Sequence, residues 1–199
     1  MEELDLLDWK RRVFALYAEV RETGGEAAWR RWRDGRDELF RDHPQSPLPP
    51  EARAAFAGLP YFDYDPALRM LADVEAGDGE LREIGASGEQ AVVFRRFGTA
   101  SFDLGGEPQR LSLFWLEAYG GGVFLPFADE TSGRETYGAG RYLLDTVKGA
   151  DLGAEGGRLV LDFNFAYNPS CSYDPRWVCP LTPPENRLTV AVRGGERVS

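Results

Sequence analysis

The most constraining feature of this chain is a change in the spacing of its apolar residues after the first forty-odd residues. Before that point, apolar side chains such as Trp9, Val13 and Tyr17 recur every three or four residues, which is the period of an amphipathic helix. From Tyr61 onward the period is two, in short runs separated by Gly, Pro or Asp turns. Because no long helical pattern lies between these runs, we expect an antiparallel sheet rather than alternating parallel strands and helices.

Together the two patterns predict an α+β fold in a single domain covering residues 1–199. Residues 1–58 are expected to form a short N-terminal helical layer and a Pro-rich connector. Residues 59–199 are expected to form an antiparallel β-barrel or β-roll on which the helices pack. The predicted strands lie at residues 67–75, 80–86, 91–97, 100–104, 110–118, 122–127, 140–147, 158–165 and 187–193.

Acidic side chains outnumber basic ones, which argues against nucleic acid as a partner. The chain has 33 Asp and Glu residues against 23 Lys and Arg residues, a formal net charge of −10, so a phosphate backbone would be repelled. No segment has the roughly 18–20 apolar residues that a membrane span requires, and the first residues lack the features of a secretory signal. We therefore expect a cytoplasmic protein without a membrane partner; the sequence does not indicate its oligomeric state.

Residues 159–168 carry an unusual number of polar side chains for a strand. In an extended conformation Asp162, Asn164 and Asn168 point to one face, and apolar side chains together with Tyr167 point to the other. Asp and Asn are depleted in strands, so two interpretations stay open. The polar row is either the solvated face of a half-buried strand or the lining of a ligand cavity.

The segment 125–142 supplies further candidate residues. Asp129 and Thr131 are turn formers whose side chains can bond their own backbone. Tyr137 lies in a Gly-rich stretch that lacks the features of a phosphate-binding loop, and Arg141 and Tyr142 open the next strand. Arg141 has the geometry to hold a carboxylate or phosphate through two hydrogen bonds, or to pair with Asp129 or Asp162 and join two strands.

Two further sets of residues invite chemical interpretations. Cys171 and Cys179 are interpreted first as reduced packing thiols, next as a disulfide, and last as part of a metal or catalytic site. His43 is the only histidine, which excludes multi-histidine metal sites. With Ser46 it invites a hydrolase interpretation, but the flanking prolines and the absence of a nucleophile elbow favour a hydrogen-bonded histidine.

Several of these residues fall in motifs that occur together. They are His43-Pro44-x-Ser46-Pro47-Leu48, Asp129-x-Thr131-x-Gly133, Thr136-Tyr137-Gly138-x-Gly140-Arg141-Tyr142, Leu161-Asp162-Phe163-Asn164, Ala166-Tyr167-Asn168-Pro169, Cys179-Pro180-Leu181 and Pro184-Glu185-Asn186. In this order they resemble the bacterial and archaeal family catalogued as domain of unknown function 1684. The resemblance covers nearly the whole chain and implies a single domain of this length, without an assigned activity. Ala139 stands where members of the family often have Gly.

We expect the function to be the binding of a small polar or anionic molecule in a barrel cavity. The candidate ligand-binding residues are Asp129, Thr131, Tyr137, Arg141, Tyr142, Asp162, Asn164, Tyr167 and Asn168. No metal and no cofactor are indicated. One alternative is a metal-independent hydrolase or isomerase with a carboxylate base and an Arg that stabilises negative charge. Another is a structural or interaction protein whose polar cluster braces a long loop.

Overall fold

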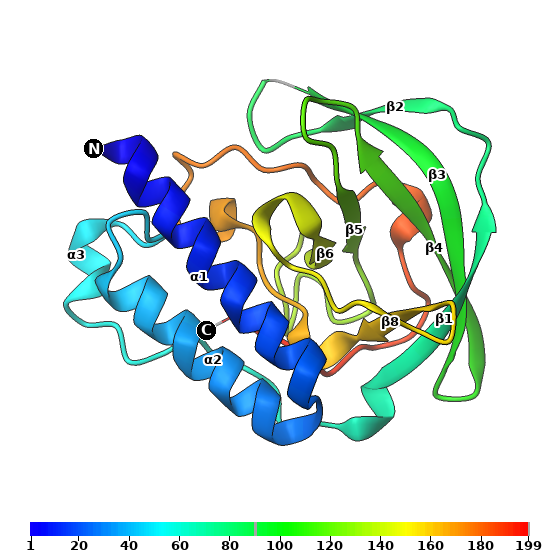
Figure 1. The fold of residues 1–199 in the computed structure, drawn as a ribbon, viewed down its shortest axis with the longest axis horizontal. Coiled ribbons are helices and arrows are strands. Elements are labelled where there is room, and N and C mark those ends of the chain that lie inside the picture. The colour runs from blue at the N-terminus through cyan, green and yellow to red at the C-terminus, as the bar shows by residue number, and fades with distance from the viewer. Residues whose placement is uncertain (90, 199) are drawn as a thin grey trace.

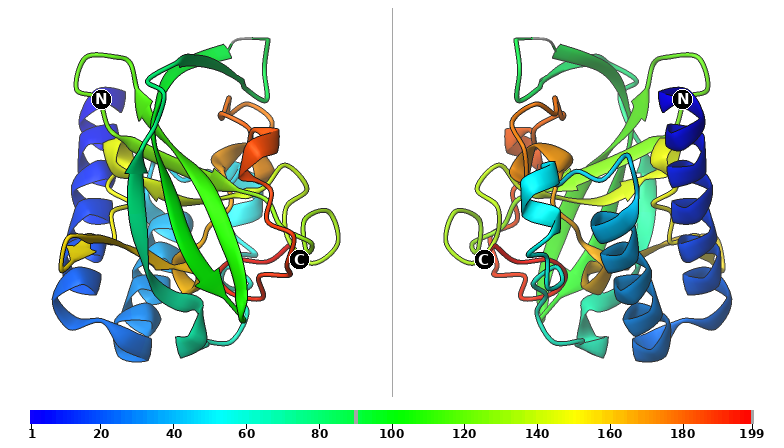
Figure 2. Two further views of the ribbon diagram at one scale, coloured as in Figure 1. Left: turned by 90° about the vertical axis from the view of Figure 1, so that its right-hand side faces the viewer. Right: turned by 90° about the vertical axis from the view of Figure 1, so that its left-hand side faces the viewer.

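The computed structural model describes residues 1–89 and 91–198, in which two long helices pack against a curled antiparallel sheet (Figure 1). Helix α1 spans Glu2–Thr23 and α2 spans Gly25–Asp42. Gly24 and Gly25 adopt φ angles of 64° and 68°, a region that glycine enters without steric cost, so the chain reverses here without a longer loop. The two helices lie side by side on one face of the sheet, as both views in Figure 2 show.

In the described part of the chain eight strands form the sheet, and every neighbouring pair is antiparallel. Their order is β6-β5-β4-β3-β1-β8-β7, and β2 pairs with β3 outside this path. Gly105 and Gly106, with φ angles of 66° and 87°, form the two-residue turn of the β3–β4 hairpin, a position where both central residues need positive φ. The strands are β1 Arg69–Ala76, β2 Leu81–Gly85, β3 Ala91–Leu104, β4 Glu107–Leu116, β5 Val123–Phe127, β6 Arg141–Asp145, β7 Ala154–Glu155 and β8 Arg158–Asp162.

The α+β prediction is confirmed, with the sheet curled into a half-barrel, but several strand boundaries shift by a few residues, the short strand β7 was not predicted, and there are three larger differences. The runs at 91–97 and 100–104 are one strand, β3, with a register shift between Arg96 and Gly98 where the pairing with β4 is irregular. The run at 158–165 ends as a strand at Asp162. The run at 187–193 forms no strand in the described part of the chain; only Arg187 makes an isolated bridge, to Ala128.

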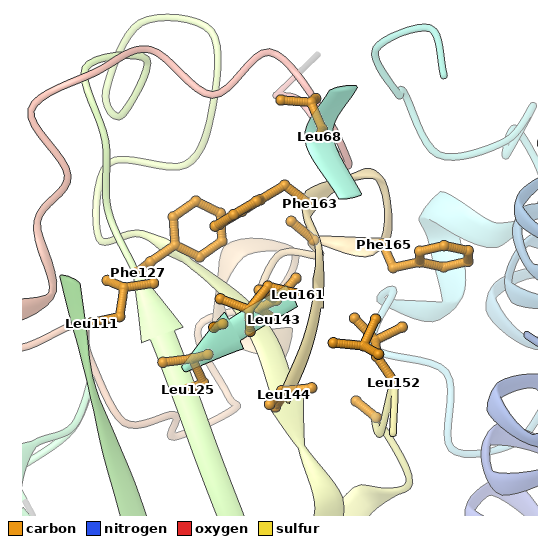
Figure 3. Packing of buried hydrophobic residues seen from close by; sticks show 14 of the residues in the cluster. Leu68, Leu111, Leu125, Phe127, Leu143, Leu144, Leu152, Leu161, Phe163 and Phe165 are labelled. Carbon is orange, nitrogen blue, oxygen red and sulfur yellow. The ribbon is translucent and has the colours of Figure 1, made fainter. Parts of the chain in front are cut away.

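The main core lies between the helices and the concave face of the sheet. Figure 3 shows side chains from β4, β5, β6 and β8 meeting there. Phe163, in the turn that follows β8, packs against Phe127 of β5, with ring centroids 5.0 Å apart. Phe165 points toward the helices and packs edge-on against Trp32 of α2, with centroids 5.1 Å apart. The helices and the sheet therefore share one hydrophobic cluster, because residues of both layers pack against the same aromatic side chains.

The Pro-rich segment after α2 crosses the molecule as an extended connector, as the sequence indicates. It contains only the short helix α3, Pro50–Arg53. The Ser46 hydroxyl donates to the Phe40 carbonyl at 2.6 Å, and the connector accepts a hydrogen bond from Trp177 at the Pro47 carbonyl. The connector thus joins the end of α2 to the loop that carries the two cysteines. No helix among residues 1–89 and 91–198 is long and apolar enough to span a bilayer.

Candidate functional site

Arg141, at the start of β6, is fully buried, and both of its Nη groups donate hydrogen bonds to protein acceptors. Nη2 donates to the Asp129 carboxylate and to the Val192 carbonyl, both at 2.9 Å, and Nη1 donates to the carbonyls of Gly194 and Glu196. Burial lowers the pKa of Arg141, while the Asp129 carboxylate opposes this shift. All four Nη protons are used, so Arg141 ties β6 to the C-terminal segment through the ion pair with Asp129.

The partner carboxylate, Asp129, is enclosed in the same way. Its Oδ1 accepts from the backbone N–H and the hydroxyl of Thr131, at 2.7 and 2.6 Å, and from the N–H of Val192 at 3.3 Å. The Thr131 hydroxyl is also 2.8 Å from that of Thr136. The fold thus brings Asp129, Thr131 and Arg141 together in a buried network in which these side chains bond one another and the backbone, and only Nε of Arg141 has no partner among the described residues.

Asp162 and Asn164 form a second structural cluster, and the predicted polar row does not continue past them. Residues Phe163–Phe165 form a 3-10 turn, in which Asp162 accepts from the backbone N–H of Asn164 at 3.1 Å and from its Nδ2 at 2.8 Å. Asn164 also binds the backbone of Asp65 at both N–H and carbonyl. The predicted strand at 158–165 is therefore confirmed only as far as Asp162, and the alternation considered for 159–168 does not continue beyond it, because the Asp162 side chain caps the turn that follows.

The buried Asp162 carboxyl gives a prediction for the pH dependence of stability. Burial raises its pKa to about 6, whereas an unfolded Asp titrates near 3.9. Because the folded state binds the proton more tightly, the free energy of unfolding falls as pH rises from about 4 to about 6. By pH 7 the loss amounts to about 2–3 kcal/mol. Asp162→Asn should remove this loss. Urea unfolding of the wild-type protein and of Asp162→Asn at pH 4.5 and pH 7.5 measures this loss. If the stability of both proteins changed equally between the two pH values, the raised pKa of Asp162 would be contradicted.

Three predicted residues, Tyr142, Tyr167 and Asn168, line a cavity of about 70 Å³ between the helices and β6. One water needs about 10–15 Å³ on such a scale, so the cavity holds several waters or part of a small molecule. An adjoining hollow of about 250 Å³ shares four lining residues with it, and the two form one cleft beside α1. The shared residues are Trp9, Pro47, Lys148 and Ser170.

Two buried polar atoms in the cavity wall have no hydrogen-bond partner among the described residues. They are the hydroxyl of Tyr17, a residue 2% exposed, and Oδ1 of Asn168, a residue 5% exposed. Asn168 is held in place because its Nδ2 donates to the Arg197 carbonyl at 3.1 Å and its backbone N–H donates to Glu196. Burial raises the pKa of Tyr17, against the lowering effect of the nearby Arg36 guanidinium.

An ion pair lies at the mouth of the cavity. The Asp145 carboxylate, at the end of β6, is only 10% exposed and forms an ion pair with Lys148 at 3.4 Å. The Lys148 side chain is 59% exposed, and the Asp145 carboxylate raises its pKa. The Asp145 charge also contributes to raising the pKa of Tyr167, after the larger effect of burial. Asp145 therefore presents a largely buried negative charge beside aromatic walls.

Behind the cavity, Arg36 of α2 forms a buried ion pair with Glu196. Nη2 of Arg36 donates to Glu196 Oε2 at 3.0 Å, and Nε donates to the Tyr61 hydroxyl at 2.9 Å. Glu196 also accepts from the Tyr173 hydroxyl and the Asn168 backbone. The guanidinium carbon lies 5.0 Å from the centroid of the Tyr167 ring. This network fixes the back wall, because it joins α2, the 167–173 segment and the C-terminal segment.

The remaining predicted residues serve other contacts. The Tyr137 hydroxyl lies 3.9 Å from Sγ of Cys171, outside the cavity. His43 is buried, with Nε2 at 3.3 Å from Asp8 and Nδ1 accepting from the N–H of Gln45 at 3.0 Å. Since the Ser46 hydroxyl donates to a carbonyl elsewhere, the two residues do not form a nucleophile–base pair. Among residues 1–89 and 91–198, no three His, Cys, Asp or Glu side chains form a metal-binding group.

Comparison with known proteins places this arrangement in a family. The model of the family described as protein of unknown function (DUF1684) matches residues 54–197. The chain belongs to the DUF1684 family. The solution NMR structure of an uncharacterized protein of Haloarcula marismortui is similar, with 37% sequence identity and a TM-score of 0.61, over 87% of this chain and 94% of that chain. A search of curated proteins found no match. The family match begins after α1 and α2, which supply one wall of the cleft in this DUF1684 member.

Sequence reasoning missed the cavity residues that come from the helices and from the end of β6. Tyr17 and Arg36 belong to helical patterns that predict an ordinary packing face, and nothing in their spacing indicates a cavity. Asp145 and Lys148 were detectable in principle, because two consecutive leucines of this strand are followed by an acid and, three residues later, by one of only two lysines.

Proposed function

We propose that the cleft between the helices and β6 binds a small polar molecule. The observation that carries this proposal is the pair of unpartnered polar atoms in the cavity wall, the Tyr17 hydroxyl and Oδ1 of Asn168. A buried polar group without a partner costs about 1–3 kcal/mol, and a ligand that supplied the missing hydrogen bonds would recover it. Binding sites of this kind combine apolar walls with a few fixed polar groups.

The chemistry of the wall favours a ligand that donates hydrogen bonds. Oδ1 of Asn168 and the Asp145 carboxylate are acceptors, and the Tyr17 hydroxyl is both donor and acceptor. The walls between them are aromatic, with Trp9 and Tyr167 among them. We therefore propose a compact molecule that bears hydroxyl or amino groups. An anion is the weaker candidate because the Nη protons of Arg141, the residue expected to hold it, are all used by protein acceptors.

Mass spectrometry of the purified protein under native and denaturing conditions is the first test. A retained ligand would add mass only in the native spectrum, and Asp145→Asn should reduce that added mass. Thermal-shift measurements with polyols, primary amines and carboxylates then rank the ligand classes. The proposal expects hydroxyl or amino compounds to raise the melting temperature more than carboxylates. A native mass equal to the denatured mass, together with no shift from any class, would contradict it.

Tyr17→Phe separates ligand binding from folding. Removing a buried hydroxyl that lacks an acceptor should raise the stability of the ligand-free protein by about 1 kcal/mol, while weakening binding of the best compound about 5- to 30-fold. The matched control is Tyr173→Phe, whose hydroxyl donates to Glu196 and whose loss should lower stability. Urea unfolding and calorimetric titration measure the two effects. Equal destabilisation by both variants would mean that the Tyr17 hydroxyl has a partner in solution.

A further inference from the structure

The loop after β8 places the two cysteines of the chain next to each other. Sγ of Cys179 accepts a hydrogen bond from the backbone N–H of Cys171 at 3.4 Å. Trp177, between them in sequence, donates to the Pro47 carbonyl at 3.2 Å, and the neighbouring Arg176 donates to the Ser46 carbonyl at 3.3 Å. The connector thus holds the loop in a shape that keeps both sulfur atoms together.

The two thiols differ in accessibility and in the groups that surround them. Cys171 is partly exposed, whereas Cys179 is 4% exposed. Hydrogen bonds from Cys179, then from Ser87 and Tyr137, lower the pKa of Cys171 to about 6. The hydrogen bond with Cys171, together with burial, raises the pKa of Cys179. An accessible thiolate beside a buried thiol is the arrangement of an attacking and a resolving cysteine.

We propose that Cys171 and Cys179 form a thiol–disulfide exchange site that reacts with a low-molecular-weight disulfide. A small disulfide is the fitting reactant because Cys171 is only partly exposed; the hollow of about 250 Å³ lies on the Cys179 side of the pair, where Cys179, Trp177 and Val178 line it. The two cysteines lie outside the cavity that contains Tyr17 and Asn168, and Cys179 lines the adjoining hollow of the same cleft; the exchange reaction does not depend on the proposed ligand.

The chemistry balances without a further reactant. The Cys171 thiolate attacks one sulfur of the small disulfide, a mixed disulfide forms, and the first small thiolate leaves. The Cys179 thiol, on losing its proton, attacks Sγ of Cys171, which forms the protein disulfide and releases the second small thiolate. The protein dithiol is oxidised by two electrons, and the small disulfide is reduced to two thiols.

Oxidised glutathione is a suitable probe, with intact-mass measurement after acid quenching. The wild-type protein should become lighter by two hydrogens, and reduced glutathione in excess should reverse the change. Cys179→Ser should stop at a mixed disulfide on Cys171 that persists. Cys171→Ser is the matched control. It cannot form the internal disulfide, and its remaining thiol, Cys179, should form a mixed disulfide much more slowly than Cys171 does in the Cys179→Ser variant. Absence of the internal disulfide in the folded wild-type protein, or an adduct that forms on Cys179 instead, would overturn the proposal.

The rate of alkylation gives a second readout that does not depend on a variant folding. Iodoacetamide should label Cys171 of the wild-type protein with a pH midpoint near 6, whereas an ordinary thiol has a midpoint near about 8.5. The titratable groups that face the pair are Tyr137, Tyr142 and Lys148, and each retains its proton well above this range. A midpoint near 8.5, or slower labelling than in the urea-unfolded chain at pH 6, would remove the attacking role.

Discussion

Replacing Arg141 by methionine is expected to lower the free energy of unfolding by about 3–5 kcal/mol. The change leaves the Asp129 carboxylate buried without its cation, and it removes the donors to the carbonyls of Val192, Gly194 and Glu196. These carbonyls have no access to bulk water beside a side chain that is 1% exposed. Urea unfolding followed by tryptophan fluorescence measures the loss, because Trp29 and Trp32 are buried in the shared core.

The control for this prediction is an exposed ion pair that joins comparable parts of the chain. Arg193 pairs with Glu135 at 2.9 Å, with side chains 63% and 35% exposed, so Arg193→Met should leave stability nearly unchanged. Combining Arg141→Met with Asp129→Asn should recover part of the loss, since the uncompensated charge is gone. If Arg141→Met folded with wild-type stability and lost ligand binding instead, Arg141 would be a binding residue rather than a brace.

The fold could be predicted from the sequence because the patterns that indicate it are local. The helical spacing of Trp9, Val13 and Tyr17 and the consecutive glycines at 24 and 25 are short-range features, and the structure confirms both. The later strand pattern was read correctly as antiparallel for the same reason. The errors occur where side chains compete with the sheet for backbone hydrogen bonds, as at Asp162, which caps a turn and ends β8.

The candidate ligand cleft could be predicted only in part, because its walls come from four distant segments. Tyr142, Tyr167 and Asn168 were predicted from polar or aromatic residues near strand ends, and all three line the cavity. Whether a polar side chain faces a cavity or another polar side chain depends on the tertiary partners. Arg141 was expected to bind a ligand, yet its hydrogen bonds go to carbonyls more than fifty residues further along the chain. Sequence spacing carries no information about such contacts.

Glu196 is the clearest case of a residue whose role depends on long-range partners, and its loss is expected to cost about 3–5 kcal/mol. It is fully buried, and burial raises its pKa, so the fold must compensate its charge. Arg36, Tyr173 and the Asn168 backbone do so. Glu196→Ala would leave the Arg36 guanidinium, whose side chain is 12% exposed, as an uncompensated charge behind the cavity.

Glu196→Ala should also weaken ligand binding in the cleft, because Glu196 positions both Arg36 and Asn168 in the cavity wall. We expect Glu196→Gln to be intermediate in stability, because it keeps an acceptor and the side-chain volume but loses the charge. Glu135→Ala, at the exposed ion pair, should change neither stability nor ligand binding appreciably. Unfolding curves and thermal shifts with the best hydroxyl or amino compound measure the two effects. If Glu196→Ala kept wild-type stability, Arg36 would have another anionic partner in solution, and the back wall of the cleft would not depend on the C-terminal segment.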